Sequence, residues 1–430
     1  MNVKKMLRID RWLGVPACFV ASGWQRLMPT RKPAPKAKSI LFIKLAEQGS
    51  TVLAYSALKE AVRRVGVRHV FMVVFEDNVF ILEALGVIPR ENIITVRSDS
   101  FASLLWTSLF AIRKLRRMRL DAAIDLEFFA RSSALLTWAS GARSRVGFHA
   151  WFGEGPYRGN LMTHRVRYNP HLHTTQTFAS LVSALDVRPE DFPRFDLQPD
   201  LPDEDLPLFV ASPREIEEGE ACVAGFTGLA ITPPLILLNA NASDLIPLRR
   251  WSAENYVTLA QRLLGRFPDV YIAFTGAGDQ ADKAQALVDH VASPRCFSLA
   301  GQTTLRQLLV LFGLAEILVT NDSGPAHFAA LTPIHTVTLF GPETPLLFAA
   351  LTPRNISLSA AIACSPCVSA LNNRQSACRD NVCMQRITPE QVFQAVCRSY
   401  RDRRAASSDG AVKRRPASAT CHEEAYGPEI

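Results

Sequence analysis

Residues 315–342 constrain the fold more than any other stretch of this 430-residue chain. An apolar run ends at residue 319, a polar turn with Gly and Pro follows at 320–325, and residues 326–331 then have helical spacing. A second apolar run, 336–340, also ends in Gly and Pro. Parallel sheets bind ligands at the carboxyl ends of their strands. The pattern therefore predicts an α/β domain with a ligand crevice at these two strand ends.

The turn after the first of these strands supplies candidate ligand-binding residues. Ser323 and Gly324 let the backbone approach a ligand closely, and free N–H groups at a helix start favour phosphate. Asp322 and His327 are expected to point into the crevice, and Gly341 to line it from the second strand. The alternative is that Asp322 only caps the helix and that His327 is an ordinary histidine of its first turn.

Strands and helices alternate along the rest of the chain, which predicts parallel sheets with helices on both faces. With 48% hydrophobic and 20% charged residues, a chain of this length is globular and fits two domains. We predict two doubly wound, Rossmann-like domains at 39–198 and 208–398, joined by an acidic, Pro-rich linker at 199–207 and followed by a disordered tail at 399–430. The predicted strands are 40–45, 69–75, 93–96 and 122–126, then 235–239, 271–275, 296–298, 317–320 and 336–340; the predicted helices of the first domain are 52–65 and 101–117.

The net charge of +8 comes entirely from residues 1–38, which hold nine Lys and Arg and a single acid, Asp10. The predicted domains therefore have no overall basic excess, which argues against nucleic acid as a partner.

Within this basic segment, residues 12–24 are mostly apolar but too short to span a bilayer, which needs about 20 residues. Trp12, Phe19 and Trp24 share one helical face, so we expect residues 1–38 to bind an anionic membrane surface, to end in a Pro-rich linker, and to be dispensable for the fold. The alternative is a signal peptide with small residues at 21–23.

A set of spaced motifs resembles glycosyltransferase family 9, the bacterial heptosyltransferases of lipopolysaccharide core assembly. The motifs NDSGPAH, LFGPETP and ITPEQV lie at 321–327, 339–345 and 387–392, and further matches lie at 39–59, 122–136, 145–148, 247–251 and 274–284. The resemblance covers about residues 38–398.

This resemblance implies a GT-B fold, in which two Rossmann-like domains face each other across a cleft. It also implies an inverting glycosyltransferase that moves a sugar, such as heptose from ADP-heptose, to a lipopolysaccharide-core or related membrane-anchored saccharide. The partners would be a nucleotide-sugar donor and a glycolipid acceptor. We expect a cytoplasmic monomer, peripheral on the inner face of the bacterial inner membrane.

On the donor side, the resemblance implies that Arg249 is the phosphate-binding cation, with Arg250 as its neighbour. The alternative is a solvated surface pair. Gly276, Asp279 and Gln280 follow a predicted strand and could hold the ribose or base. No Asp-x-Asp lies at a strand end, so we expect no catalytic metal.

On the acceptor side, the sequence departs from the family pattern. The family has an Asp directly after the glycine of its N-terminal motif, where it is expected to act as base, but here Gly49 is followed by Ser50. Glu47 is the nearest carboxylate and our candidate base. The alternatives are Asp125 or Glu127 as base, or a catalytically lapsed relative that binds a nucleotide sugar or glycolipid without turnover. A nucleotide-sugar epimerase of the same architecture is a third interpretation.

Four cysteines near the C-terminal end, Cys364, Cys367, Cys378 and Cys383, have a spacing close to that of a four-thiolate zinc site. A structural zinc is one interpretation, and free or partly oxidised thiols are the other.

Overall fold

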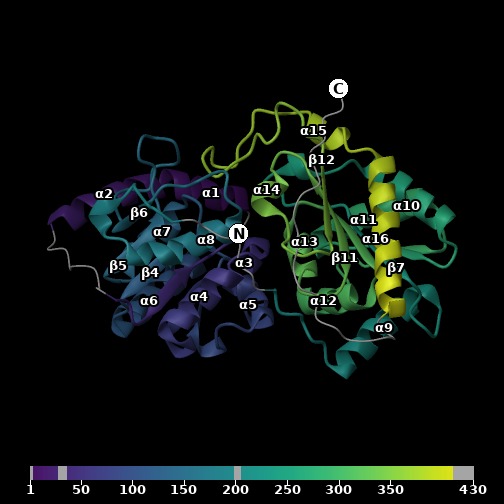
Figure 1. The fold of residues 1–430 in the computed structure, drawn as a ribbon, viewed down its shortest axis with the longest axis horizontal. Coiled ribbons are helices and arrows are strands. Elements are labelled where there is room, and N and C mark those ends of the chain that lie inside the picture. Colours follow the sequence, from purple (N-terminus) through teal and green to yellow (C-terminus); the bar gives the residue numbers. More distant parts are fainter. Residues whose placement is uncertain (1–2, 28–35, 198–204, 410–430) are drawn as a thin grey trace.

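The computed structural model describes residues 3–27, 36–197 and 205–409, and these form two α/β domains side by side (Figure 1). Each domain holds a six-stranded sheet, with the orders β3-β2-β1-β4-β5-β6 and β12-β11-β10-β7-β8-β9. Every strand pair is parallel. The predicted architecture of two doubly wound domains is therefore confirmed.

The first sheet is built around β1, whose four residues are all fully buried. A strand covered by helices on both faces reads as a continuous apolar run, which is why it could be predicted. At its carboxyl end, Ile43 lies beside Val73 and Asp125 of the neighbouring strands. The strands are β1 (Ile40–Ile43), β2 (Val70–Phe75), β3 (Ile93–Val96), β4 (Ala122–Asp125), β5 (Ser144–Phe148) and β6 (His164–Val166).

Helices cover both faces of this sheet. On one face lie α4 (Tyr55–Val65), α5 (Val79–Leu85) and α8 (Thr174–Ser183), and the short α3 (Gln48–Val52) lies at the edge toward the second domain. On the other face lie α6 (Phe101–Met118) and α7 (Arg131–Ala139). The predicted helix 52–65 corresponds to α4, which begins at Tyr55, and Val52 is the last residue of the separate helix α3. The 3-10 turns of this domain are η1 (Val67–His69), η2 (Glu76–Asn78), η3 (Arg90–Asn92), η4 (Ala184–Asp186) and η5 (Pro189–Asp191).

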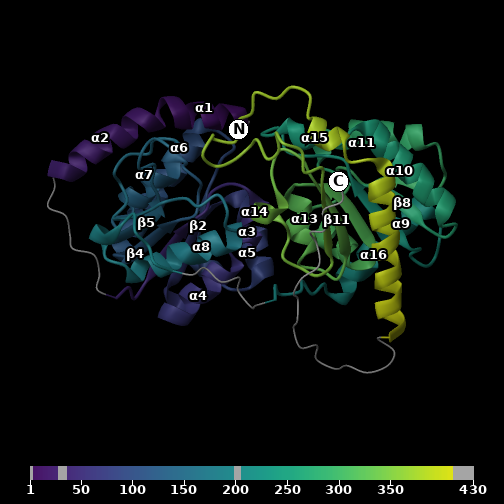
Figure 2. The ribbon, with the colours of Figure 1, turned by 45° about the horizontal axis from the view of Figure 1, so that its top comes forward.

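The N-terminal helices α1 (Val3–Trp12) and α2 (Gly14–Leu27) lie over α7 (Figure 2). Cys18 and Ala21 are buried in a cluster with Leu161 and Met162. The carboxylate of Asp10 accepts hydrogen bonds from the first N–H groups of α7, those of Arg131 (3.0 Å) and Ser132 (2.8 Å). These helices therefore pack on the first domain and do not form a separate segment. That residues 1–38 are dispensable for the fold stays a prediction. Residues 28–35 of the predicted linker lie outside the described residues.

We expect Asp10→Ala to lower the free energy of unfolding by about 1–3 kcal/mol, because α7 would lose a charged cap and the Arg131 guanidinium, 3.2 Å away, its ion-pair partner. Chemical denaturation measures the loss, and limited proteolysis shows whether α1 and α2 detach. The matched control is the exposed Glu91→Ala. Equal stability of the two variants would show that the contacts of Asp10 do not contribute to stability.

The second sheet consists of β7 (Leu235–Asn239), β8 (Tyr271–Phe274), β9 (Cys296–Ser298), β10 (Ile317–Asn321), β11 (His335–Phe340) and β12 (Asn355–Ser359). One face is covered by α10 (Ala253–Arg266), α11 (Ala281–Val291) and α16 (Pro389–Asp409). The other is covered by α9 (Pro213–Thr227), α12 (Leu305–Leu314) and α13 (Gly324–Ala329). Shorter elements are η6 (Pro247–Arg249), η7 (Gly278–Gln280), α14 (Pro345–Phe348) and α15 (Val382–Gln385).

Helix α16 corrects the predicted disordered tail, because it continues to Asp409. Tyr400 is buried with its ring centroid 4.7 Å from that of Phe267, and Arg403 forms an ion pair with Glu316. Residues 410–430 of the predicted tail lie outside the described residues. None of the helices within the described ranges has the length and apolar content needed to cross a membrane.

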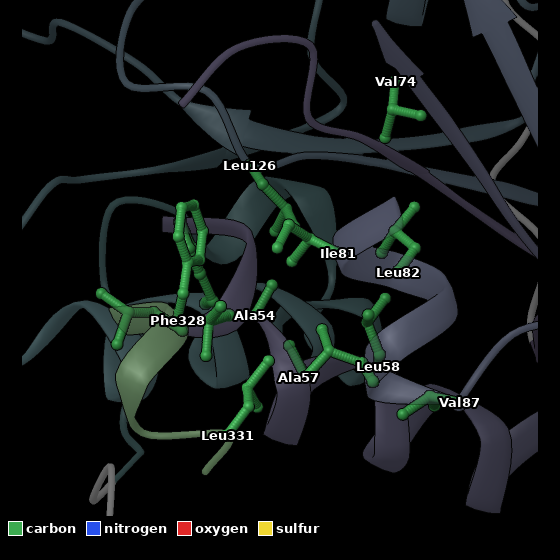
Figure 3. Close-up of a cluster of buried hydrophobic side chains, with 14 of the residues drawn as sticks. Ala54, Ala57, Leu58, Val74, Ile81, Leu82, Val87, Leu126, Phe328 and Leu331 are labelled. Atoms are coloured by element: carbon green, nitrogen blue, oxygen red, sulfur yellow. The ribbon is translucent and has the colours of Figure 1, made fainter. Parts of the chain in front are cut away.

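The two domains meet through α13, which packs against α3. Phe328 and Leu331 belong to the same buried cluster as Ala54 and Ala57 of the first domain, and Figure 3 shows them facing each other. One apolar cluster therefore runs through both domains, and it fixes how the carboxyl ends of the two sheets face each other.

Candidate active site

Arg249 lies at the centre of a buried polar group in the second domain. Its Nε lies 3.3 Å from Oδ2 of Asp322, which follows β10, and its Nη2 contacts the carboxylate of Glu343, which follows β11. Its Nη1 donates to the backbone oxygen of Asp322 at 3.4 Å. The sequence indicated Arg249 and the Asp322 turn separately as ligand-binding, and the structure brings the two together. Glu343 was not predicted, although it lies inside the quoted motif LFGPETP.

The charges of this group do not balance, since one guanidinium faces two carboxylates. Burial raises the pKa of Asp322, while the nearby Arg249 lowers it. Arg249 Nε and Asp322 Oδ2 are close, yet neither atom has a well-aligned hydrogen bond within the described residues. Buried polar atoms are normally paired. The group is therefore suited to exchange these contacts for the polar atoms of a ligand.

His327, on α13, is the second predicted residue of this wall, and its side chain is buried. Burial, assisted by the nearby His173 and Arg249, lowers the pKa of His327 to about 3. Its Nδ1 has no hydrogen-bond partner among the described residues. His327 is therefore a neutral imidazole with one ring nitrogen free for a ligand, and it is not a cation for a phosphate.

The lowered pKa predicts a pH dependence of stability. The unfolded state takes up a proton on His327 below its ordinary pKa of about 6.5, whereas the folded state does not until about pH 3, so stability falls as the pH drops between these values. At about pH 5 the loss amounts to about 2 kcal/mol. Between about pH 7 and pH 5, the melting temperature of His327→Gln should fall less steeply with decreasing pH than that of the wild type. The control is the exposed His69→Gln, whose melting temperature should fall as steeply as that of the wild type. An unchanged slope would contradict the burial of a neutral His327.

The opposite wall is the turn after β1, where Gly49 comes close to α13. A Cβ atom at position 49 would lie 2.7 Å from Cδ2 of His327 and 3.0 Å from Cα of Gly324. Only glycine leaves room for this approach without a shift of the backbone. The turn that carries Glu47 and Ser50 is thereby held against the predicted donor wall.

Glu47 has a left-handed backbone with φ of 64°, and its carboxylate lies among several polar groups. It forms an ion pair with Arg374, lies 3.8 Å from Nζ of Lys44, and accepts a hydrogen bond from Oγ of Ser50 at 3.3 Å. The carboxylate of Glu47 therefore lies beside the side chain at position 50, where the family motif has its Asp.

The two alternative carboxylates are engaged inside the first domain. Asp125 is fully buried, forms an ion pair with Arg158, and accepts a hydrogen bond from Ser133 at 2.9 Å. Glu127 accepts hydrogen bonds from the backbone of Ala46 at 2.8 Å and from Lys44 at 3.3 Å. Of the three candidates, Glu47 is the one in the turn that approaches α13.

The remaining predicted donor residues lie outside the Arg249 group. Arg250 contacts the carboxylate of Asp244 and donates to the backbone oxygen of Ala242 at 2.9 Å. The loop after β8 carries Gly276, Asp279 and Gln280 in sequence, with Asp279 exposed. A Cβ at Gly276 would lie 2.7 Å from Nδ2 of Asn241, so this glycine permits a close contact between two strand ends.

Gly341 and Ser323 have local structural roles. A Cβ at Gly341 would collide with the side chain of Met384. Ser323 precedes α13, but its hydroxyl bonds back to the oxygen of Asn321 at 3.0 Å and does not cap the helix.

Two residues that the sequence did not indicate join the domains at this site. Arg374, from the loop between β12 and α15, pairs with Glu47 and lies 5.7 Å from the ring centroid of Phe128 in the first domain. His173 caps α8 and contacts the oxygen of Ala349 through Nε2 at 3.0 Å. Their contacts are formed across the domain boundary, so no local sequence pattern identifies them.

A cavity of about 190 Å³ lies beside His327, lined by residues of both domains that include Val52, Tyr55, Thr175 and Leu351. Apolar and hydroxyl-bearing side chains thus border the imidazole on this side.

The four cysteines of the predicted zinc site lie in the loop that carries Arg374 and at its end in α15. Burial raises the pKa of Cys383, and the thiols of Cys367, Cys378 and Cys364 raise it further. Among the described residues, however, no group of three or more His, Cys, Asp or Glu has an arrangement suited to hold a metal. The structural zinc stays a prediction.

The curated proteins to which this chain is similar include heptosyltransferases. Over 145 residues the chain is 32% identical to lipopolysaccharide heptosyltransferase 2 of Salmonella typhimurium, covering 33% of this chain and 41% of the relative. Over 245 residues it is 29% identical to lipooligosaccharide heptosyltransferase 2 of Haemophilus ducreyi. This match covers 55% of this chain and 65% of the relative. The matches thus span less than two thirds of these curated relatives.

Solved structures extend the likeness to the fold. Heptosyltransferase II of Escherichia coli, described as an ADP-heptose enzyme, has a TM-score of 0.60 and 18% identity, over 85% of this chain and 99% of that one. A family 9 glycosyltransferase of Veillonella parvula has a TM-score of 0.62 and 18% identity, over 85% of this chain and 98% of that one. These likenesses support the GT-B arrangement. Since the model of glycosyltransferase family 9 (heptosyltransferase) matches residues 109–377, the chain belongs to that family.

Proposed function

We propose that this protein transfers a sugar from a nucleotide diphosphate to a hydroxyl group of a saccharide acceptor. One observation carries the proposal: the Gly49 turn, with Glu47, abuts α13, next to the group formed by Arg249, Asp322 and Glu343. A cation for the diphosphate and a carboxylate for the acceptor hydroxyl would then come from the two sides of this contact between the domains.

Heptose from an ADP-linked donor is the sugar we propose, and a lipopolysaccharide-core or related saccharide is the acceptor. The support comes from relatives: the matched enzymes are named lipopolysaccharide or lipooligosaccharide heptosyltransferases. A further structure with a TM-score of 0.54 holds ADP-2-deoxy-2-fluoro heptose. We place the protein on the cytoplasmic face of the inner membrane as a peripheral monomer.

In the proposed mechanism Glu47 takes the proton of the acceptor hydroxyl. The acceptor oxygen then forms a bond to the anomeric carbon while the bond from that carbon to the diphosphate oxygen breaks, with inversion. Arg249 stabilises the negative charge that the leaving diphosphate gains. Since Arg374 holds Glu47 in an ion pair, this pair has to loosen as the acceptor hydroxyl approaches.

Replacement of the donor cation tests the diphosphate seat. Arg249→Ala should weaken ADP binding by about tenfold or more, because hydrogen bonds to charged groups contribute about 1.5–3 kcal/mol each. Arg250→Ala is the matched control, since Arg250 bonds the backbone of Ala242. Isothermal titration calorimetry with ADP measures both. If Arg250→Ala loses more affinity than Arg249→Ala, the diphosphate binds elsewhere.

Replacement of the proposed base tests the chemistry. Glu47→Gln should lower kcat by about 10²–10⁴-fold, the usual contribution of general-base catalysis, and leave ADP affinity unchanged. Ser50→Asp should keep activity, since it puts a carboxylate where the family has one. Assays with ADP-heptose and a heptose-free core saccharide report the rates. Full activity of Glu47→Gln would remove Glu47 from the mechanism.

A second candidate function is a lapsed relative that binds a nucleotide sugar or glycolipid without turnover. It is favoured by Ser50 at the family's Asp position and by the ion pair that occupies Glu47. A wild-type protein that binds ADP but transfers no sugar to any core saccharide would support it.

A further inference from the structure

Helix α6 has an apolar face that nothing in the described residues covers. Its inner side, with Ala111 and Leu115, is buried against the first sheet. Its outer side exposes five large apolar side chains, namely Phe101 (47%), Leu105 (53%), Trp106 (73%), Leu109 (44%) and Phe110 (70%). They follow each other at spacings of one, three and four residues, so they form one continuous stripe. Such a contiguous patch marks an interaction surface.

The same helix is basic where the apolar stripe ends. Arg113, Lys114 and Arg117 are exposed on the next two turns, and α6 contains no acid. No ion pair among the described residues engages these three side chains. The face is therefore apolar at one end and positively charged at the other.

Helices α1 and α2 repeat this composition on the same side of the first domain. Both contact α7, as α6 does, and Met6 of α1 packs against the cluster that holds Ala111 and Leu115 (Figure 2). Their exposed apolar side chains include Trp12 (74%) and Trp24 (54%). The exposed cations of the two helices are Lys5, Arg8, Arg11 and Arg26.

The one acid of α1 and α2, Asp10, is turned inward onto the start of α7. The outer surfaces of α1, α2 and α6 thus combine exposed aromatic rings with cations alone.

We infer that α6 joins α1 and α2 in one docking surface for an anionic lipid bilayer. Aromatic side chains fit the headgroup region, and cations of a single sign fit anionic lipids. A second copy of this chain fits less well, because a symmetric contact would bring like charges together. The inference rests on the proposed function, in which the acceptor is membrane-anchored. It adds α6, which lies far along the sequence from residues 1–38, to the membrane-binding surface expected from the sequence.

The test is binding to lipid vesicles made of an equal mixture of phosphatidylcholine and phosphatidylglycerol. The double variant Trp106→Ser, Phe110→Ser should co-sediment about tenfold less, because two aromatic rings no longer enter the headgroup region. The matched control is Val210→Ser, Ile231→Ser in the second domain, where both side chains are 83% exposed, and it should bind as the wild type does. Circular dichroism melting curves establish that the variants are folded.

A charge variant tests the basic end independently. Arg113→Glu, Lys114→Glu should lose binding to the mixed vesicles, and the wild type should bind pure phosphatidylcholine weakly and lose affinity with salt. The inference is overturned if the Trp106, Phe110 variant binds as tightly as the wild type. It is also overturned if light scattering shows that this variant turns an oligomer into a monomer with unchanged vesicle binding.

These outcomes are separable from the proposed function, because vesicle binding needs neither donor nor turnover. If Trp12→Ser, Trp24→Ser loses vesicle binding but the α6 variant does not, the proposal of a membrane-bound transferase stands. The inference that α6 is part of the docking surface is then overturned. Loss in both variants, in a protein without transfer activity, would retain the docking surface and reject the transferase.

Discussion

The contact between the Gly49 turn and α13 is the constraint on which the candidate active site depends. The backbone of the first domain approaches His327 and Gly324 of the second so closely that a single Cβ would not fit. Phe328 and Leu331, packed into the cluster that both domains share, keep α13 in place. The position of Glu47 relative to the Arg249 group is therefore set by the packing between domains and not by either domain alone.

On both sides of this contact, buried and half-buried charged side chains hold one another. Arg249 is shared by Asp322 and Glu343, and Glu47 is shared by Arg374 and Lys44. Buried ion pairs contribute little net stability, since desolvation offsets much of their attraction. Their value here is positional, because each pair holds a charged side chain in one orientation. In the proposed function, a diphosphate would compete for Arg249 and an acceptor hydroxyl would compete for Glu47.

The sequence predicted those elements whose burial leaves a continuous apolar run. Strands β1, β7 and β10, each with every residue buried, were predicted to within two residues at either end. Strands β5, β6 and β12 were missed because each carries charged or polar residues. The end of α16 was missed because its basic composition resembles that of a disordered tail. Within the site, motifs indicated Arg249 and Asp322, whereas Arg374 becomes a partner of Glu47 only through the tertiary fold.

In the proposed function, Glu47 supplies the carboxylate that the family's Asp would supply at the position of Ser50. Glu47 starts three residues earlier, but its left-handed backbone and longer side chain bring the carboxylate to the hydroxyl of Ser50 at 3.3 Å. A left-handed conformation is unfavourable for glutamate, at about 1 kcal/mol or more, so the fold holds this residue against a local preference. The anchors are Arg374 from the second domain and Lys44 from the first. Glu47 is thus held by contacts from both domains, so the position of its carboxylate depends on how the two domains pack against each other.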